Sequence, residues 1–183
     1  IKAREWVDHR ERATRKKRWA EAEEDTPYTG QELDRSVVNT SQIRNVIQAM
    51  KTAVETQIYP HRQETPKTLI FAKTDSHADD IIKIVREVYG QGNAFCKKVT
   101  YRAEEDPDSV LAAFRNEYHP RIAVTVDMIA TGTDVKPLEV LLFMRDVRSK
   151  GYYEQMKGRG VRSLDGDSLK RVSNSADGAK TRF

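Results

Sequence analysis

The sequence predicts an α/β fold in which a parallel sheet carries helices on both faces, preceded by a helical segment at the N-terminus. Two observations predict it. After residue 67, short apolar runs without polar alternation occur four times, and stretches with helical spacing separate them. Strands of this kind are buried on both faces, which is typical of parallel sheets covered by helices.

The expected strands and helices alternate along this part of the chain. The strands cover residues 68–72, 94–100, 121–127 and 139–144, and the helices cover residues 78–88, 104–118 and 151–161. Gly90 and Gly92 end the first of these helices, and Pro107 with Asp108 opens the second. Because ligands of parallel sheets bind at the carboxyl ends of the strands, the segments to search are 73–76, 100–102, 125–134 and 145–149.

An amphipathic helix is expected within residues 31–66. The apolar side chains of this region are Leu33, Val37, Ile43, Ile47, Met50, Val54 and Ile58. After a break at Ser36–Asn39 they recur at spacings of three or four, as on one buried helix face. Asn39, Thr40 and Ser41 are suitable cap residues for its start, and Pro60 stops it. We assign packing and no chemistry to this helix.

Residues 1–30 are rich in charge, and we expect them to form an exposed helix, or a helix separated from its native neighbour, that ends near Pro27. Basic side chains between residues 10 and 18 are followed by acidic side chains between residues 21 and 25. Trp6 and Trp19 supply too little apolar surface for an independent core. The basic cluster is compatible with a contact to nucleic acid. The simpler interpretation is a solvated helix with opposite charges spaced along it.

The chain has 183 residues and a formal net charge of +4, and that excess lies entirely in its last part. Residues 150–183 hold eight basic and four acidic side chains, whereas the rest of the chain is balanced. Such a segment attracts phosphate groups, and it is also typical of a solvated tail. No apolar run is long enough for a membrane-spanning helix, and the single Cys96 excludes an intramolecular disulfide framework.

Four regions follow from these patterns. We expect a charged helical lead-in over 1–30, a helical linker that packs on the next domain over 31–66, the main domain over 67–165 and a basic segment over 166–183. The chain starts at Ile1 and stops at Phe183 just after a charged stretch. We therefore interpret it as part of a longer protein.

The most specific pattern is Q-x-x-G-R-G-x-R. In one helix, Gln155, Gly158, Arg159 and Arg162 would share a face, because they are three or four residues apart. Two guanidinium groups and an amide on one face suit a polyphosphate, since arginine binds phosphate oxygens in a bidentate manner. The glycines would let another surface approach. A basic surface helix without a ligand is the plain alternative.

Two further segments lie at expected strand ends. Residues 125–134 lie at the end of a buried strand and offer hydroxyl groups, a glycine and two carboxylates. We interpret them as a loop that binds a ribose or an incoming arginine, in preference to a catalytic pair of carboxylates. Residues 68–74 end in Lys73 and Thr74, which are able to hold a backbone phosphate. Neither segment is specific when taken alone.

Together these segments resemble motifs IV, IVa, V and VI of superfamily 2 helicases. They read T-L-I-F-A-K-T at 68–74, F-R at 114–115, A-V-T-V-D-M-I-A-T-G-T-D-V at 123–135 and Y-E-Q-M-K-G-R-G-V-R at 153–162. Over about residues 28–165 the sequence is most similar to the motor (R) subunit of type I restriction enzymes. The resemblance implies a RecA-like sheet, and specifically the second, C-terminal lobe of such a motor.

For nucleotide chemistry, the resemblance implies ATP and Mg²⁺ bound between two lobes and held mainly by the first one, which is missing here. Arg162 and Arg159 would face the phosphates, with Arg162 as the finger that stabilises charge on the γ-phosphoryl group. Gln155 would hydrogen-bond near the phosphates. Gly132 and Asp134 would belong to the ATP site, with Asp134 meeting the ribose or the arginines.

For DNA, the resemblance implies a track for the sugar-phosphate backbone of double-stranded DNA, lined by Lys73, Thr74, Thr125 and Thr131. The implied partners are the first RecA-like lobe and the nuclease domain of the same chain, together with methyltransferase and specificity subunits. The implied location is the cytoplasm of a bacterium or archaeon, with no membrane contact. No metal site is expected in this chain.

The parent protein would be a type I site-specific deoxyribonuclease with an ATP-dependent translocase. The chain contains neither G-x-x-x-x-G-K-[ST] nor a D-E-x-[HD] box, so we expect no ATPase activity from it alone. Other classes stay open. The chain also suits a non-catalytic helicase-like module that binds nucleic acid or a protein, or the second lobe of another superfamily 2 DNA or RNA helicase.

The remaining candidate residues receive structural interpretations. Metal-ligand spacing is absent among the four histidines, which are His9, His61, His77 and His119. Cys96 is expected to be an inert buried thiol, and Phe114 a core residue. For Arg115, a position at the edge of the hydrophobic core and a functional contact within a motif are equally compatible with the sequence.

Overall fold

The computed structural model describes residues 6–10, 17–21, 37–126, 135–147, 149–158 and 162–176, and the chain divides into two compact units. The first unit spans Ile1–Val46 and the second spans Ile47–Phe183, with the boundary inside one helix. In the described part of the chain, no helix has the length and apolar character needed to cross a membrane.

Among the described residues of the first unit, three antiparallel strands form a sheet in the order β2-β1-β3. They are β1 (Trp6–Arg10), β2 (Lys17–Glu21) and β3 (Val37–Val38). The helical lead-in predicted over 1–30 is therefore wrong in the described stretches. The reason is that β1 takes its hydrogen bonds from β2, in a register that sets Trp6 opposite Glu21, and charge spacing within one segment does not reveal a partner strand.

The amphipathic helix predicted within residues 31–66 is present. Helix α2 (Thr40–Ala53) continues as a short π-helix, η1 (Val54–Ile58). The side-chain oxygen of Asn39 accepts a hydrogen bond from the amide of Gln42 at 3.1 Å, which satisfies one donor at the start of the helix. Ile47 and Val54, two members of the predicted apolar stripe, are buried.

A parallel sheet of four strands forms the centre of the described part of the second unit. Its strands are β4 (Thr68–Phe71), β5 (Cys96–Val99), β6 (Ile122–Thr125) and β7 (Val140–Phe143), in the order β5-β6-β4-β7. The strands are paired in step, so their last residues lie at the same level. All four predicted strands are confirmed, each slightly shorter than predicted.

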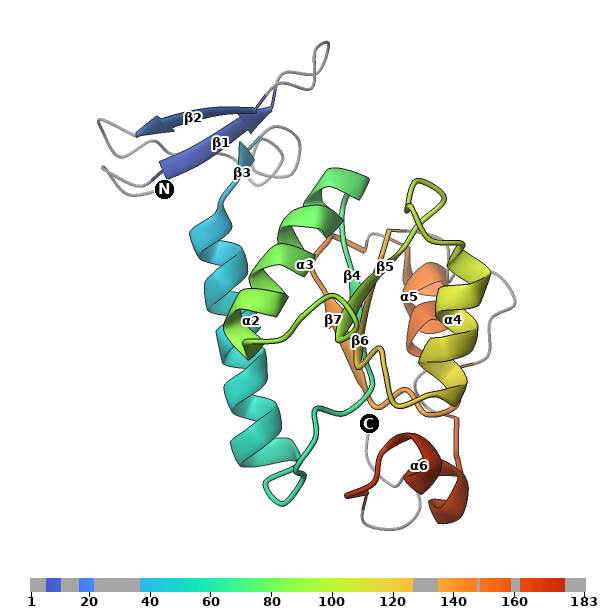
Figure 1. Cartoon of the computed structure of the whole chain (residues 1–183). Coiled ribbons are helices and arrows are strands. Elements are labelled where there is room, and N and C mark those ends of the chain that lie inside the picture. The colour runs from blue at the N-terminus through green and yellow to red at the C-terminus, as the bar shows by residue number, and fades with distance from the viewer. Residues whose placement is uncertain are drawn as a thin grey trace. The chain divides into compact units, whose positions relative to one another are not determined.

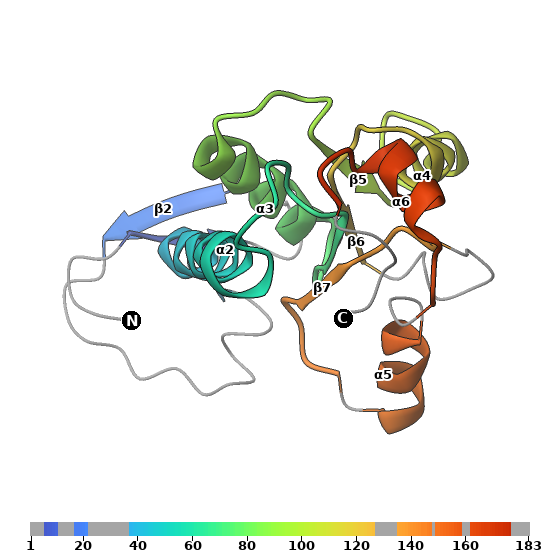
Figure 2. The same ribbon diagram turned by 90° about the horizontal axis from the view of Figure 1, so that it is seen from below.

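Helices cover both faces of this sheet, as the sequence predicts (Figure 1). Helix α3 (Asp75–Tyr89) and the second half of α2 lie on one face, and α4 (Pro107–Asn116) and α5 (Lys150–Lys157) lie on the other. Figure 2 shows the same arrangement from below. The core under α4 and α5 takes alternate residues of the strands together with helix residues, among them Leu69, Phe71, Val99, Ala123, Val110, Phe114 and Met156.

The C-terminal part differs from the prediction in two ways. Helix α5 ends at Lys157, so the helix predicted over 151–161 is shorter than expected. A further helix, α6 (Gly166–Val172), lies within 166–183, where the sequence predicted only a basic segment. Leu169 and Val172 of α6 are buried. Two apolar positions in seven residues are too few for a periodic signal, which is why α6 was missed.

Candidate functional site

The carboxyl edge of the parallel sheet collects the segments selected from the sequence. Residues 72–74 follow β4, residues 100–102 follow β5, Val126 follows β6, and Met144 follows β7. Because the four strands are parallel and end in step, these segments meet at one edge, where ligands of such sheets bind. The candidate site consists of this edge together with α5 and the residues that follow it.

Lys73 and Thr74 connect the end of β4 to the start of α3. Thr74 has an extended backbone (φ −139°, ψ 164°) and caps α3, with its hydroxyl oxygen accepting from the amide of His77 at 3.1 Å. The amide of Lys73 donates to Nδ1 of the His77 ring at 3.2 Å. Lys73 is half-buried and Thr74 is exposed, so both are within reach of a ligand.

A polar network beside this segment joins α3 to β5. The carboxylate of Asp75 accepts from Nζ of Lys98 at 2.8 Å and from the hydroxyl of Thr100 at 2.7 Å. Lys98 also donates to Asp79 at 2.8 Å. Burial raises the pKa of Asp75, but the hydrogen bonds from Lys98 and Thr100 outweigh burial and lower this pKa below its ordinary value. The carboxylate is therefore ionised at neutral pH and engaged by β5.

Thr125 does not belong to the accessible edge. It is the last residue of β6, its exposed fraction is 0%, and its hydroxyl donates to the carbonyl of Val99 at 2.8 Å. The predicted contact between Thr125 and DNA is therefore wrong for this structure. The physical reason is that β6 lies between β5 and β4 and is covered on both faces, so its final side chain ties the strands together instead of meeting solvent.

Arg145, which the sequence analysis did not select as a site residue, links three parts of this edge. Its guanidinium group donates to the carbonyl of Val126 at 3.0 Å and lies over the Tyr152 ring, 6.0 Å from the ring centroid. Arg145 thereby joins the ends of β6 and β7 to α5. The available signal was an arginine at the start of the segment 145–149, but nothing in the sequence identifies its partners.

Helix α5 places Gln155 and leads toward Arg162. The hydroxyl of Ser149 accepts from the amide of Tyr152 at 3.3 Å and caps the helix, while Met156 is buried in the core. Gln155 and Arg162 are exposed. Arg162 lies beyond the end of the helix, so the single helix face predicted for Q-x-x-G-R-G-x-R is wrong for this arginine. The predicted site residues Arg159, Thr131, Gly132 and Asp134 lie outside the described residues.

The described part of the second unit contains neither a cluster of metal ligands nor a reactive thiol. No three His, Cys, Asp or Glu side chains come together there in a group able to hold a metal ion. The thiol of Cys96 is buried, and burial raises its pKa to about 12, so it stays protonated at neutral pH. The interpretation of Cys96 as an inert buried thiol is confirmed, as is the core position of Phe114, whereas Arg115 is exposed.

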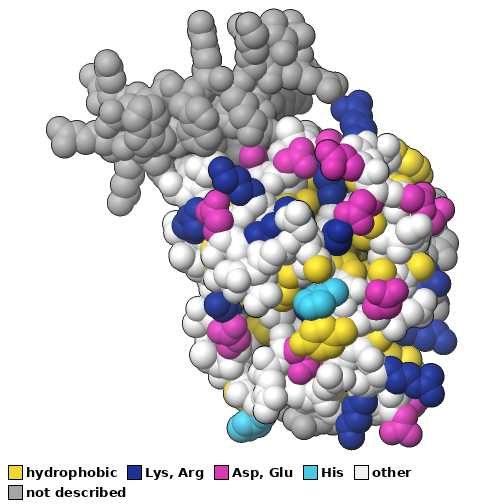
Figure 3. All heavy atoms as spheres, viewed as in Figure 1, with side chains coloured by type: hydrophobic (Ala, Val, Ile, Leu, Met, Phe, Trp, Pro, Cys, Tyr) yellow, Lys and Arg dark blue, Asp and Glu magenta, His cyan; other side chains and the backbone are white. Residues whose placement is uncertain are grey.

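Charged side chains of both signs are mixed on the face shown in Figure 3, without one broad basic patch. The excess positive charge of the chain lies in residues 150–183.

The opposite, amino-terminal edge of the sheet holds buried charges. Lys67, Arg121 and Glu139 directly precede β4, β6 and β7, and their exposed fractions are 0%, 1% and 4%. Nζ of Lys67 donates at 2.6, 3.1 and 2.7 Å to three main-chain carbonyls between α4 and β6, those of Glu117, Tyr118 and Pro120. The buried ammonium group thus has all three of its donors satisfied.

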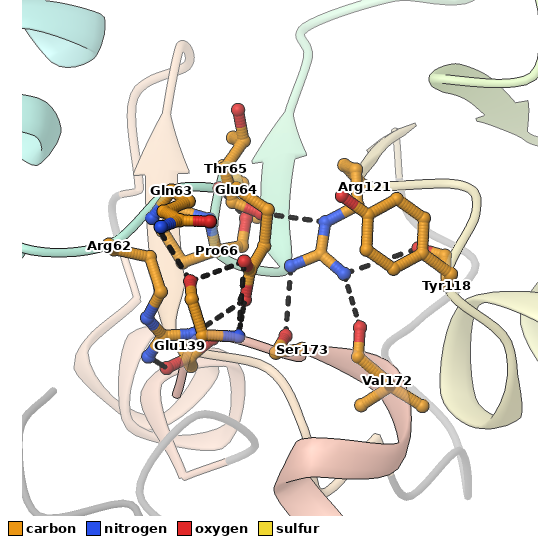
Figure 4. Close-up of polar contacts among 12 residues, drawn as sticks. Arg62, Gln63, Glu64, Thr65, Pro66, Tyr118, Arg121, Glu139, Val172 and Ser173 are labelled. Atoms are coloured by element: carbon orange, nitrogen blue, oxygen red, sulfur yellow. Dashed lines mark hydrogen bonds and ion pairs between the residues drawn. The ribbon is translucent and has the colours of Figure 1, made fainter. Parts of the chain in front are cut away.

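Arg121 fastens the end of α6 to this edge (Figure 4). Its guanidinium group donates to the carbonyls of Thr65 and Val172 and, at 2.9 Å, to the hydroxyl of Ser173. Sequence reasoning missed this role because a charged residue next to a strand carries no sign of being buried. The role is structural, since every named partner belongs to the same chain.

A second set of ionic contacts supports the same junction (Figure 4). Arg62 pairs with Glu139 at 2.6 Å, and Glu64 accepts from both the amide and the hydroxyl of Ser175. Burial raises the pKa of Glu64, but the bonds from Ser175 and the nearby Arg62 lower it overall. The contacts of these residues therefore fasten the C-terminal segment to this edge of the sheet.

Comparison with known proteins agrees with this geometry. Residues 45–163 match the family described as the helicase conserved C-terminal domain. The chain belongs to this family. The matched range contains the whole parallel sheet and helices α3, α4 and α5, so the carboxyl edge described above is that of a helicase C-terminal domain.

Two known proteins extend the comparison for this helicase domain. The "Type I restriction enzyme EcoKI endonuclease subunit" of Escherichia coli (strain K12) is 35% identical over 127 residues, which are 64% of this chain and 11% of that protein. The chain thus spans about a tenth of the length of that relative. A solved fragment assigned to the HsdR subunit of a type I restriction enzyme from Vibrio vulnificus YJ016 has a TM-score of 0.53 at 20% identity, covering 73% of this chain and 27% of that one. This structural likeness confirms the α/β fold.

Proposed function

We propose that the second unit is the second RecA-like lobe of an ATP-dependent DNA translocase, in the motor subunit of a type I restriction enzyme. The observation that carries the proposal is the carboxyl edge of the sheet, where the half-buried Lys73 and the exposed Thr74 follow β4 beside the end of β7, from which the chain continues to α5. Support comes from membership of the helicase C-terminal family and from 35% identity to the EcoKI subunit over 127 residues.

On this proposal, Arg162 and Arg159 approach the phosphates of ATP bound on a first lobe, and Gln155, Gly132 and Asp134 contribute to the same site. ATP and Mg²⁺ are held mainly by that other lobe, because this chain has no G-x-x-x-x-G-K-[ST] loop to cradle the phosphates. An arginine finger must be accessible to a neighbouring domain, and Arg162 is exposed. When bound, the nucleotide supplies the phosphoryl group whose developing charge Arg162 stabilises.

The DNA side of the proposal rests on Lys73, Thr74 and Thr131, which grip the backbone phosphates of duplex DNA without reading its sequence. Thr125 is left out, because it is buried. The partners are the first lobe and nuclease domain of the parent chain, with methyltransferase and specificity subunits, in the cytoplasm of the cell. The whole parent protein is then a restriction endonuclease.

The finger assignment is tested in the full-length parent protein by Arg162→Ala. We expect ATP affinity within about twofold of wild type and a kcat for DNA-stimulated hydrolysis that falls by about 10³-fold or more, because the charge on the γ-phosphoryl group loses its partner. ATP binding by fluorescence titration and phosphate release measure the two quantities.

The matched control is Arg171→Ala, which removes an exposed arginine from the end of α6 and should leave turnover unchanged. Normal turnover in Arg162→Ala would contradict the motor assignment and favour a non-catalytic helicase-like module.

A further inference from the structure

We propose that His77 is a positioning residue that holds the Lys73–Thr74 segment in the conformation required to bind a backbone phosphate. The inference rests on the proposed DNA-binding role of that segment and adds to it a residue outside the recognised motifs. His77 lies in the first turn of α3 and is 6% exposed, so it does not itself meet DNA. Its contacts with the segment carry the argument.

Two reciprocal hydrogen bonds connect His77 to the segment. The amide of His77 donates to the hydroxyl oxygen of Thr74 at 3.1 Å, and the amide of Lys73 donates to Nδ1 of the His77 ring at 3.2 Å. The pattern is that of a capping box, in which the third residue of a helix reaches back to a main-chain amide near the cap. A histidine stands here at the position of the usual Glu or Gln, but its Nδ1 accepts from the amide of Lys73, the residue before the cap, whereas a Glu or Gln side chain bonds the amide of the cap residue itself.

These bonds determine which atoms of the segment remain for a phosphate. Because Nδ1 accepts a hydrogen bond, the ring is neutral and carries its proton on Nε2. The amide of Lys73 is used inside the segment, so any phosphate contact of Lys73 comes from its side chain. The oxygen of Thr74 accepts from His77, which leaves the hydroxyl hydrogen to donate, either to Ser76 at 3.3 Å or to a phosphate oxygen.

The local charges favour the same arrangement. Asp75 follows Thr74 directly and would repel a phosphate if its carboxylate pointed at the segment. Instead, Lys98 and Thr100 bind that carboxylate from β5 at 2.8 and 2.7 Å. In the first turn of α3, the carboxylate of Asp75 thus points toward β5, whereas His77 is bonded to the Lys73–Thr74 segment.

Two amide substitutions test the position of the acceptor. His77→Asn places an oxygen near the position of Nδ1, whereas His77→Gln places one near the position of Nε2. With duplex DNA at low salt, we expect His77→Asn to keep the affinity of this chain within about twofold, and His77→Gln and His77→Ala to lower it about five- to tenfold. Fluorescence anisotropy with a labelled duplex measures the affinity. Equal affinities for all four proteins would overturn the inference.

A cap elsewhere in the chain separates positioning from general stability. Asp165→Ala removes the cap bond to Ser168 at the start of α6, and it should lower the melting temperature without changing DNA affinity. The amide proton resonance of Lys73 should shift in His77→Gln and stay near its wild-type position in His77→Asn. An unshifted Lys73 resonance in His77→Gln would overturn the positioning role.

The outcomes also separate this inference from the function on which it rests. A wild-type chain without salt-dependent DNA binding would overturn the proposed DNA contact and the inference together. Salt-dependent binding that His77→Ala leaves unchanged would overturn the positioning role alone.

Discussion

At the scale of single residues, the two edges of the parallel sheet use basic side chains in opposite ways. Lys73, at the carboxyl edge, is half-buried, and Arg162, beyond the end of α5, is exposed, so both side chains are accessible to a ligand. At the amino-terminal edge, Lys67 and Arg121 are almost completely buried, and their donors are taken by main-chain carbonyls and one hydroxyl. On the proposed function, lysine and arginine thus serve ligand binding on one side of the domain and packing at the amino-terminal edge.

Lys67 makes the stability of the chain depend on pH in a defined direction. Burial and the nearby charge of Arg121 lower its pKa from 10.5 to about 7. Between those two values the unfolded chain binds the additional proton, so the free energy of unfolding rises with pH. We expect the stability of wild type relative to Lys67→Met to increase from about pH 7 to about pH 9, as measured by urea unfolding of both proteins.

At neutral pH, Lys67→Met should itself lower the free energy of unfolding by about 2–4 kcal/mol, because buried carbonyls lose their donor. Lys97→Met is the matched control, since Lys97 lies on β5 and pairs with the exposed carboxylate of Glu105, and its effect should stay below about 1 kcal/mol. A wild-type advantage that stays constant or shrinks at alkaline pH would contradict the lowered pKa of Lys67.

At the scale of elements, α6 depends most on the rest of the fold. A helix of seven residues is not stable alone, and α6 is held by the Asp165 cap, by the buried Leu169 and Val172, and by the bond from Arg121 to the carbonyl of Val172. The strands of the parallel sheet differ from α6 in that they can be predicted, because their apolar runs indicate burial on both faces. The β1–β2 pair resembles α6, since the partner of each strand is visible only in the fold.

We expect Leu169→Ala to lower the free energy of unfolding by about 2–4 kcal/mol, because it leaves a cavity under α6. Lys170→Ala, at the exposed neighbouring position, should change it by less than about 0.5 kcal/mol. Urea unfolding gives the two values, and hydrogen exchange of the amides in 166–172 should speed up in Leu169→Ala only. Unchanged exchange in that variant would show that α6 is not anchored through Leu169.

At the scale of the whole molecule, the proposed function makes this chain one side of a shared site. Thr74, Gln155 and Arg162 are exposed on it, but its sequence has no phosphate-cradling loop, and its described residues include no group able to hold a metal ion. A phosphoryl transfer site needs a cradle and a metal in addition to the finger. On the proposed function, those parts lie on another lobe.

This chain alone is therefore expected to release no phosphate from ATP above the protein-free blank, with or without duplex DNA. A colorimetric phosphate assay measures the rate, and the full-length parent protein serves as the positive control. Turnover by the chain alone that increases with added DNA would contradict the division of the site between two lobes.

The class of fold, the positions of the four parallel strands and the motifs of a helicase C-terminal domain could all be predicted from the sequence. These features depend on local apolar periodicity and on residue identity, both of which are readable along the chain. The fold was needed to show that Thr125 is buried, that Arg162 lies beyond the helix and that His77 is hydrogen-bonded to Lys73 and Thr74. Accessibility and hydrogen-bond partners depend on segments that fold over a residue from elsewhere in the chain, and no local pattern records them.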